Sequence, residues 1–241
     1  MTPAHLIEAL RTESAALLDA CTADPDAPVP SCPGWHRAQL LAHTGMAQAW
    51  HLAQVEAGPT ERVRYSSVPP APQGDALYVW FATGADALAR ALSDLDDHTI
   101  WTTWAGPQPS SFFPRRMALE TAVHRWDAAP GPLPADLAVA GIDELLEVFT
   151  RLLPPDRLGG ADGTIHLHAT DEELTDGGEW LVAFGPEGIT SRHGHAKGDV
   201  ALRGRASDLF LWTWNRVPID GRFEVFGDAE LLDVWATAVV F

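Results

Sequence analysis

The chain has 241 residues, 46% of them hydrophobic, which is enough for one large domain or two of ordinary size with a sizeable core. Its 33 acidic and 16 basic residues give a formal net charge of −17, which argues against nucleic acid or an anionic membrane surface as a partner. With only two cysteines, no signal-peptide pattern and no stretch of roughly 20 apolar residues, we expect a soluble, cytoplasmic protein without a disulfide framework.

Four helices are expected in the first half of the chain, because apolar residues recur there at helical spacing. The proline-rich segment 23–35 separates the first two helices, since proline prevents a regular element. A Pro/Ser-rich loop covers residues 58–73, and residues 98–111 alternate β-branched residues and tryptophans around a Gly-Pro turn, which predicts a short extended segment. Four helices joined by loops favour a bundle. The predicted helices cover residues 2–21, 36–57, 74–95 and 112–127.

The composition changes after Asp127, where a proline-rich stretch indicates a linker. Beyond a further helix, short stretches alternate apolar and polar residues with turns between them, which predicts a small sheet. We therefore predict an α+β protein, with a helical bundle over residues 1–130 and a smaller α+β domain over residues 131–241. In that second domain, helices are predicted over 134–153, 206–216 and 229–241, and strands over 164–170, 179–185, 188–193, 199–204 and 222–228.

Glu120 and His124 of the fourth predicted helix are candidate ligands for a divalent metal. Their i, i+4 spacing places both side chains on one helix face, with Cβ atoms roughly 5–6 Å apart. They lie among apolar residues, where an unpaired carboxylate would be costly and a metal would offset that cost. His43, directly after an apolar run in the second helix, is the best candidate for a third ligand. Ordinary polar pairing of these residues is the alternative, and Asp127 either orients a ligand histidine or faces solvent.

Several motifs resemble one known family. They are CPGW at 32–35, LLAHTG at 40–45, ETAVHRWDA at 120–128, and LFLWTWNR followed by FEVFGDAELLDVW near the C-terminus. Together they resemble the mycothiol-dependent maleylpyruvate isomerase family over nearly the whole chain. The resemblance implies a DinB-like four-helix bundle that carries a divalent metal, usually zinc, on His43, Glu120 and His124. It also implies mycothiol as the thiol cosubstrate, and a functionally important arginine at Arg216.

The chemistry that this resemblance implies begins with a thiol at an open metal position, which favours the nucleophilic thiolate. An isomerase would add that thiolate reversibly to an activated double bond of a small electrophilic substrate, whereas an S-transferase would keep the adduct. Arg216 would hold a substrate carboxylate or stabilise an enolate, or else form a salt bridge. Two other functions stay open: a hydrolase with water at the metal, and a binding protein without turnover.

Two further features have simple alternatives. Cys32 is a candidate nucleophile, but no partner that would activate its thiolate is evident in the sequence, and the resemblance implies that it belongs to the loop that packs against the second helix. His166 and His168 share a face of their predicted strand, and His193 and His195 can do the same, so this region is either a second metal site or a set of exposed sheet positions.

Overall fold

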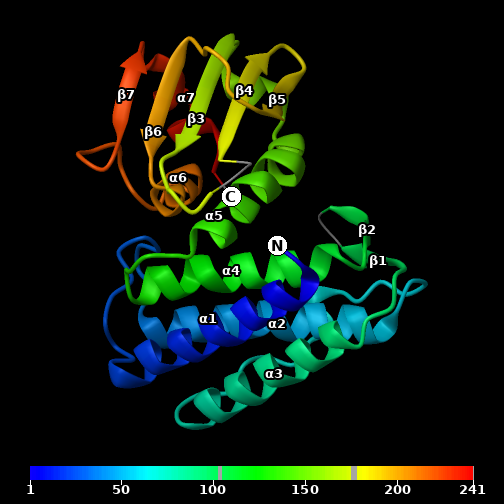
Figure 1. Ribbon diagram of the computed structural model, residues 1–241. Coiled ribbons are helices and arrows are strands. Elements are labelled where there is room, and N and C mark those ends of the chain that lie inside the picture. Colours follow the sequence, from blue (N-terminus) through cyan, green and yellow to red (C-terminus); the bar gives the residue numbers. More distant parts are fainter. Residues whose placement is uncertain (103–104, 175–177, 241) are drawn as a thin grey trace. The chain divides into compact units, whose positions relative to one another are not determined.

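The computed structural model describes residues 1–102, 105–174 and 178–240, and it divides into two compact units, Met1–Gly131 and Pro132–Phe241. The first unit consists mainly of helices, and the second combines helices with a five-stranded sheet (Figure 1). The predicted α+β class, with a helical region followed by an α+β region, is confirmed. Among the described residues, no helix is long and apolar enough to cross a bilayer.

The first unit packs four helices around a shared apolar core (Figure 1). The first helix begins after Thr2, whose hydroxyl accepts a hydrogen bond from the backbone N–H of His5 at 3.3 Å, and Pro3 occupies the first turn. All four helices agree closely with the predicted ranges. They are α1 (Pro3–Ala23), α2 (Arg37–Ala57), α3 (Ala76–Ser93) and α4 (Phe112–Ala128). Their core includes Leu17, Leu40, Leu41, Leu77 and Phe81.

The predicted extended segment before α4 is also present. Strands β1 (Thr99–Thr102) and β2 (Gly106–Pro109) pair antiparallel. Thr103 and Trp104, which lie within the predicted segment, are outside the described residues. In the loop between α2 and α3, a short 3-10 turn, η1, covers Tyr65–Ser67.

The helix predicted over residues 134–153 changes its hydrogen-bond pattern along its length. It begins as α5 (Ala135–Glu144) and then passes through η2 (Leu145–Phe149), a π-helical turn, and η3 (Thr150–Leu152), a 3-10 turn. The Thr150 hydroxyl donates to the Leu146 carbonyl at 2.7 Å, a local bond of the kind that competes with the regular ladder. Two prolines follow and prevent a continuous helix, so a separate 3-10 turn, η4, covers Pro155–Leu158.

The sheet of the second unit has the strand order β5-β4-β3-β6-β7. Only β3 and β6 run parallel, and every other neighbouring pair is antiparallel. The strands match the predicted segments, and two helices complete the unit. The strands are β3 (Gly163–Ala169), β4 (Glu179–Gly185), β5 (Gly188–His193), β6 (Val200–Gly204) and β7 (Glu224–Gly227), and the helices are α6 (Ala206–Thr213) and α7 (Glu230–Ala238).

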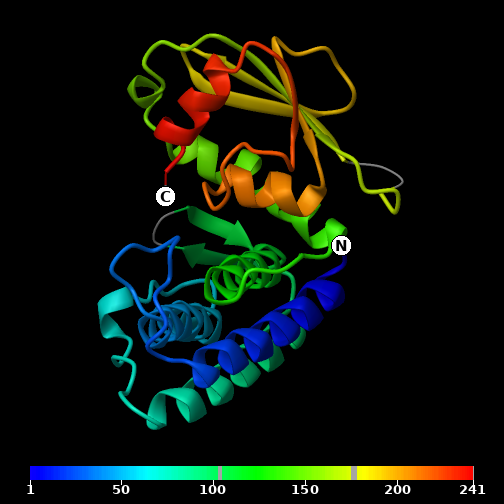
Figure 2. The ribbon, with the colours of Figure 1, turned by 90° about the vertical axis from the view of Figure 1, so that its left-hand side faces the viewer.

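One face of this sheet packs against α6 and α7 (Figure 2). On that face Phe184 contacts the ring of Trp235, which stacks on Trp212 at 5.6 Å between ring centroids. Since side chains alternate along a strand, Ile165 and Leu167 are buried on the helix side, while the residues next to them on β3 point to the opposite face. That opposite face carries His166 and His168 of β3 and Glu179 of β4.

Candidate metal centre

The CPGW motif forms a tight turn beside His43. The backbone N–H of Trp35 donates to the Cys32 carbonyl at 3.0 Å, and Gly34 takes a φ of 86°, as expected for the third residue of a type II turn after proline. This turn places the Trp35 ring edge-on to the His43 ring, with centroids 5.1 Å apart. The Cys32 sulfur lies 3.9 Å from Asp127 Oδ2, so the loop also contacts α4.

The structure brings together the three residues predicted as metal ligands. His43 comes from α2, while Glu120 and His124 come from adjacent turns of α4. Glu120 Oε1 lies 3.2 Å from His124 Nε2 and 4.0 Å from His43 Nε2. Each residue offers one donor atom, and these three atoms lie within 4.8 Å of one another. Two nitrogens and one oxygen therefore converge on one point between the two helices.

Two charged neighbours orient the α4 ligands. Asp127 Oδ2 lies 3.0 Å from His124 Nδ1, which places the proton on Nδ1 and turns Nε2 toward the cluster. Arg116 pairs with Glu120 Oε2 and leaves Oε1 facing the histidines. The side chains of Arg116 and Asp127 are 4% and 0% exposed, whereas the His43 side chain is 40% exposed. The side of the cluster at Arg116 and Asp127 is thus buried and charged, and the side at His43, its accessible front, is open to solvent.

The charges around the cluster set the protonation of its members. Burial raises the pKa of Glu120, but the Arg116 guanidinium and the two histidines outweigh it and hold that pKa well below its usual range. Burial opposes protonation of His124 as well, yet its hydrogen bonds to Asp127 and Glu120 raise its pKa to about 9. Burial lowers the pKa of His43, and the nearby His124 adds to this. The environment therefore supplies an ionised carboxylate and one neutral imidazole.

These residues fit a divalent metal. In a tetrahedral site with bonds of about 2.0–2.1 Å, donor atoms lie about 3.3 Å apart. The separation of His124 Nε2 and Glu120 Oε1, 3.2 Å, is close to that value, and that of His43 Nε2 and Glu120 Oε1 is somewhat larger, at 4.0 Å. A metal would take the place of the second proton of a charged His124, the one on Nε2, while Nδ1 keeps its proton toward Asp127. Three protein ligands would leave one coordination position for an exogenous group.

Two residues near the cluster were not predicted from the sequence. Arg116 precedes Glu120 by one helical turn, so its i, i+4 spacing was a usable signal. His51 lies two turns beyond His43 on α2 and is buried, with Nδ1 2.8 Å from the Ala47 carbonyl oxygen. Its Nε2 has no hydrogen-bond partner among the described residues, and burial lowers its pKa to about 4. Its neutrality could not be inferred from the sequence, because it follows from burial.

Arg216 belongs to the second unit. The helix predicted over 206–216 ends at Thr213, because Asn215 takes a left-handed φ of 56°. The N–H groups of Asn215 and Arg216 donate to the carbonyls of Trp212 and Leu211 at 2.9 and 2.8 Å, which is the Schellman pattern of a helix end. Arg216 therefore follows the helix cap, half-buried, at a cavity of about 590 Å³ lined also by Asn215, Val217 and Asp233.

Comparison with known proteins gives two family matches. A domain family described as "Mycothiol maleylpyruvate isomerase N-terminal domain" matches residues 7–129, and one described as "MDMPI C-terminal domain" matches residues 136–233. No curated protein sequence matches the chain.

Solved structures of a mycothiol-dependent maleylpyruvate isomerase share the fold. One, of a point mutant, aligns at a TM-score of 0.63 with 12% identity over 90% of each chain. Another, also a mycothiol-dependent maleylpyruvate isomerase, aligns at 0.62 with 13% identity over 93% of each chain. At these identities the structural matches establish a common fold over almost the whole length.

Proposed function

The chain belongs to the mycothiol maleylpyruvate isomerase family, and we propose that it is a metal- and mycothiol-dependent enzyme acting on a small electrophilic substrate. The observation that carries this proposal is the convergence of His43, Glu120 and His124 at one point with an accessible front. The two structures aligned above are of a mycothiol-dependent maleylpyruvate isomerase. A low-molecular-weight thiol needs a reducing compartment, so we place the enzyme in the cytoplasm.

The three proposed ligands would hold a divalent metal, zinc in the simplest case. When bound, such a metal supplies a position at which a thiol loses its proton and becomes nucleophilic. Arg116 keeps Glu120 ionised, and Asp127 keeps Nε2 of His124 directed at the cluster. The half-exposed side of His43 provides the approach for the thiol and the electrophile. These residues account for thiol activation, and the substrate must be selected elsewhere.

We further propose that Arg216 binds the substrate. A guanidinium suits a carboxylate or a developing enolate because it offers paired donors in one plane. Arg216 lines a cavity of about 590 Å³, and its Nη1 donates to the Trp214 carbonyl at 2.9 Å, which fixes part of its orientation. If the thiolate leaves the adduct again after rotation about the new single bond, so that the C–S bond breaks and the double bond re-forms, the enzyme is an isomerase. If the C–S bond stays in the product, the enzyme is an S-transferase.

Cobalt substitution and mycothiol titration test the proposal. We expect Co²⁺-loaded protein to show a sulfur-to-cobalt charge-transfer band when mycothiol is added, and no such band with S-methylated mycothiol. His43→Ala and Glu120→Gln should abolish the band, whereas His5→Ala, which removes an exposed histidine of α1, should leave it unchanged. Absence of the band in Co²⁺-loaded wild-type protein would refute thiol binding at this centre.

Thiol dependence separates the enzyme classes. A hydrolase that uses water at the metal should turn over substrate without any thiol, and mycothiol should not stabilise it. A binding protein should take up metal and thiol but convert no electrophile. We expect activity on activated alkenes only with mycothiol present, and mass analysis of the product would distinguish isomerisation from a thioether adduct.

A further inference from the structure

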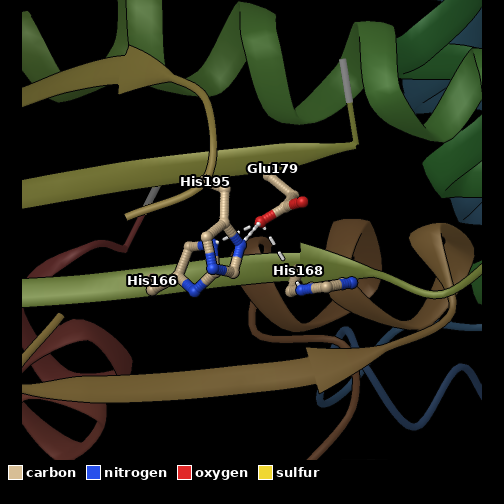
Figure 3. Close-up of side chains that lie close together, drawn as sticks. All are labelled: His166, His168, Glu179 and His195. Atoms are coloured by element: carbon tan, nitrogen blue, oxygen red, sulfur yellow. Dashed lines mark hydrogen bonds and ion pairs between the residues drawn. The ribbon is translucent and has the colours of Figure 1, made fainter. Parts of the chain in front are cut away.

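A second cluster of metal-binding side chains lies in the second unit, on the sheet face opposite α6 and α7 (Figure 3). It consists of His166, His168, Glu179 and His195. Glu179 Oε2 lies 2.6 Å from His195 Nδ1, 2.8 Å from His166 Nε2 and 3.5 Å from His168 Nδ1. One donor atom from each of the four residues lies within 4.8 Å of all the others. Three imidazoles therefore surround a single carboxylate oxygen.

The strand register brings three of these residues together. His166 and His168 are two positions apart on β3 and so share a face. Glu179 begins β4 and lies directly opposite His168 in the antiparallel pair. The hairpin between these strands places a carboxylate across from two histidines, which requires only the register of β3 and β4 and no loop geometry.

A short loop after β5 carries the fourth residue, His195, over the sheet. The N–H of Gly194 donates to the Glu179 carbonyl at 3.0 Å, with a φ of 113° that L residues rarely adopt. At the other end, a Cβ on Gly198 would lie 2.9 Å from the backbone nitrogen of His166, so the loop packs directly on β3. The N–H of Asp199 donates to the Thr164 carbonyl at 3.0 Å. Both ends of the loop are thus attached to the two strands that carry the other ligands.

The alternative interpretation, that these histidines are only exposed positions of the sheet, does not fit their surroundings. His166 is only 5% exposed although it points away from the helices, because the other side chains of the cluster and the loop cover it. His193, the fourth histidine of the region, instead pairs with Asp143 at 2.9 Å and does not join the cluster. Exposure to solvent therefore does not explain why three imidazoles converge on one carboxylate.

We propose that His166, His168, Glu179 and His195 form a second metal site, which binds a divalent transition metal such as zinc. Three imidazole nitrogens and one carboxylate oxygen are ligands that zinc prefers, and four protein ligands complete a tetrahedron. A filled coordination shell is typical of structural sites, so this metal would connect β3, β4 and the loop after β5 and stabilise the second unit. The inference does not depend on the proposed enzyme activity, since it uses other residues.

Metal counting in variants of the full chain tests this site separately from the first. In a His43→Ala/Glu120→Gln background, with the first cluster disabled, native mass spectrometry in excess Zn²⁺ should find one bound zinc per chain. Adding His168→Ala and His195→Ala should remove it; both side chains are partly exposed, at 30% and 76%, so these changes should not unfold the protein. The matched control, His193→Ala in the same background, should retain the zinc.

Two outcomes would overturn the proposal. One is a background protein that binds no zinc while circular dichroism shows it to be folded. The other is zinc binding of equal stoichiometry and affinity with and without His168 and His195. Thermal unfolding gives an independent readout, because chelation should lower the Tm of the background protein and leave the Tm of the variant lacking His168 and His195 unchanged.

Discussion

At the scale of single residues, Arg116 decides how Glu120 behaves. This arginine is 4% exposed and pairs with the Glu120 oxygen that does not face the histidines. Burial raises the pKa of Glu120, but the charge of Arg116, together with His124 and His43, holds that pKa low. A residue that is not itself a proposed ligand therefore helps to keep a ligand of the proposed metal ionised.

The first prediction follows from that ion pair. Arg116→Met should raise the pKa of Glu120 and weaken zinc binding at the first cluster by about 10- to 100-fold, the usual effect of losing a partner that orients a ligand. Competition with a chelator of known affinity measures this change. Arg11→Met, which removes a partly exposed arginine of α1 that pairs with Asp86, should have a much smaller effect. Equal affinities in the two variants would contradict the assigned role.

The second prediction concerns pH and His51. The pKa of His51 is about 4 in the folded chain and about 6.5 when unfolded. As pH falls from 6.5 to 4, the unfolded chain binds a proton that the folded chain does not, so the free energy of unfolding decreases. The stability that neutral His51 contributes is fully present above pH 6.5. About 2 kcal/mol of it is lost when the pH falls from 7 to 5.

Denaturant unfolding of the metal-free protein at pH 7 and pH 5 measures this effect. The variant His51→Phe keeps an aromatic ring beside Trp50 and Phe113 but cannot titrate. Its free energy of unfolding should therefore decrease by about 2 kcal/mol less between pH 7 and pH 5 than that of the wild-type chain. Comparing the two proteins removes the contributions of all other titrating groups. Identical losses in both would show that His51 is protonated in the folded state.

At the scale of elements, backbone conformation is decisive in the loop before α2. Gly34 and Gly84 both have open space where a Cβ would lie, but Gly34 has a φ of 86° and Gly84 lies within α3. Gly34→Ala should destabilise the first unit by about 1–2 kcal/mol, because an L residue is strained in the left-handed region. Gly84→Ala should stabilise it by about 0.5–1 kcal/mol through helix propensity.

The same pair of variants tests the link between this turn and the metal centre. Since the turn sets Trp35 against His43, Gly34→Ala should also alter metal or mycothiol binding, whereas Gly84→Ala should not. Unfolding curves and the cobalt spectrum provide the two measurements. A destabilised Gly34→Ala protein with an unchanged cobalt spectrum would show that the turn serves stability alone.

The elements also show why parts of the molecule were predictable. Helical and strand periodicities depend on which residues are apolar, so the four helices of the first unit and the five strands of the second unit's sheet agree with the sequence pattern. The end of α6 was not predictable in this way, because Asn215 terminates it through a left-handed backbone angle that periodicity does not encode. The apolar spacing likewise did not predict the change to a π-helical turn after α5.

Sites differ in how far the sequence predicts them. Glu120 and His124 are neighbours by helix geometry alone, whereas His43 required the packing of α2 on α4. The sequence placed His166 and His168 on one strand face, but it did not predict that Glu179 and His195 lie beside them. Glu179 faces them only through the hairpin register, and His195 arrives only through a loop fixed by glycines. Long-range register and loop geometry are set by tertiary contacts.

At the scale of the whole molecule, the two proposed metals lie in different compact units, which makes their effects separable. A ligand that binds only the folded state stabilises it by RT ln(1 + [L]/Kd), about 2.7 kcal/mol at a hundredfold excess over Kd. The formal net charge of −17 also attracts divalent cations in a non-specific way, and this attraction between exposed charges is largely screened at about 0.15 M salt. Measured at that ionic strength, metal-dependent stability should therefore be local to each unit.

Hydrogen exchange in the presence and absence of a chelator tests this final prediction. In the wild-type chain, chelation should accelerate amide exchange both in α2 and α4 and in β3 and β4. In His43→Ala the acceleration should remain only in the strands, and in His168→Ala/His195→Ala only in the helices, because each variant has already lost the stabilisation that the chelator removes. If chelation instead accelerated exchange uniformly in every variant, metal would act on the molecule as a whole, and the assignment of one metal to each unit would be wrong.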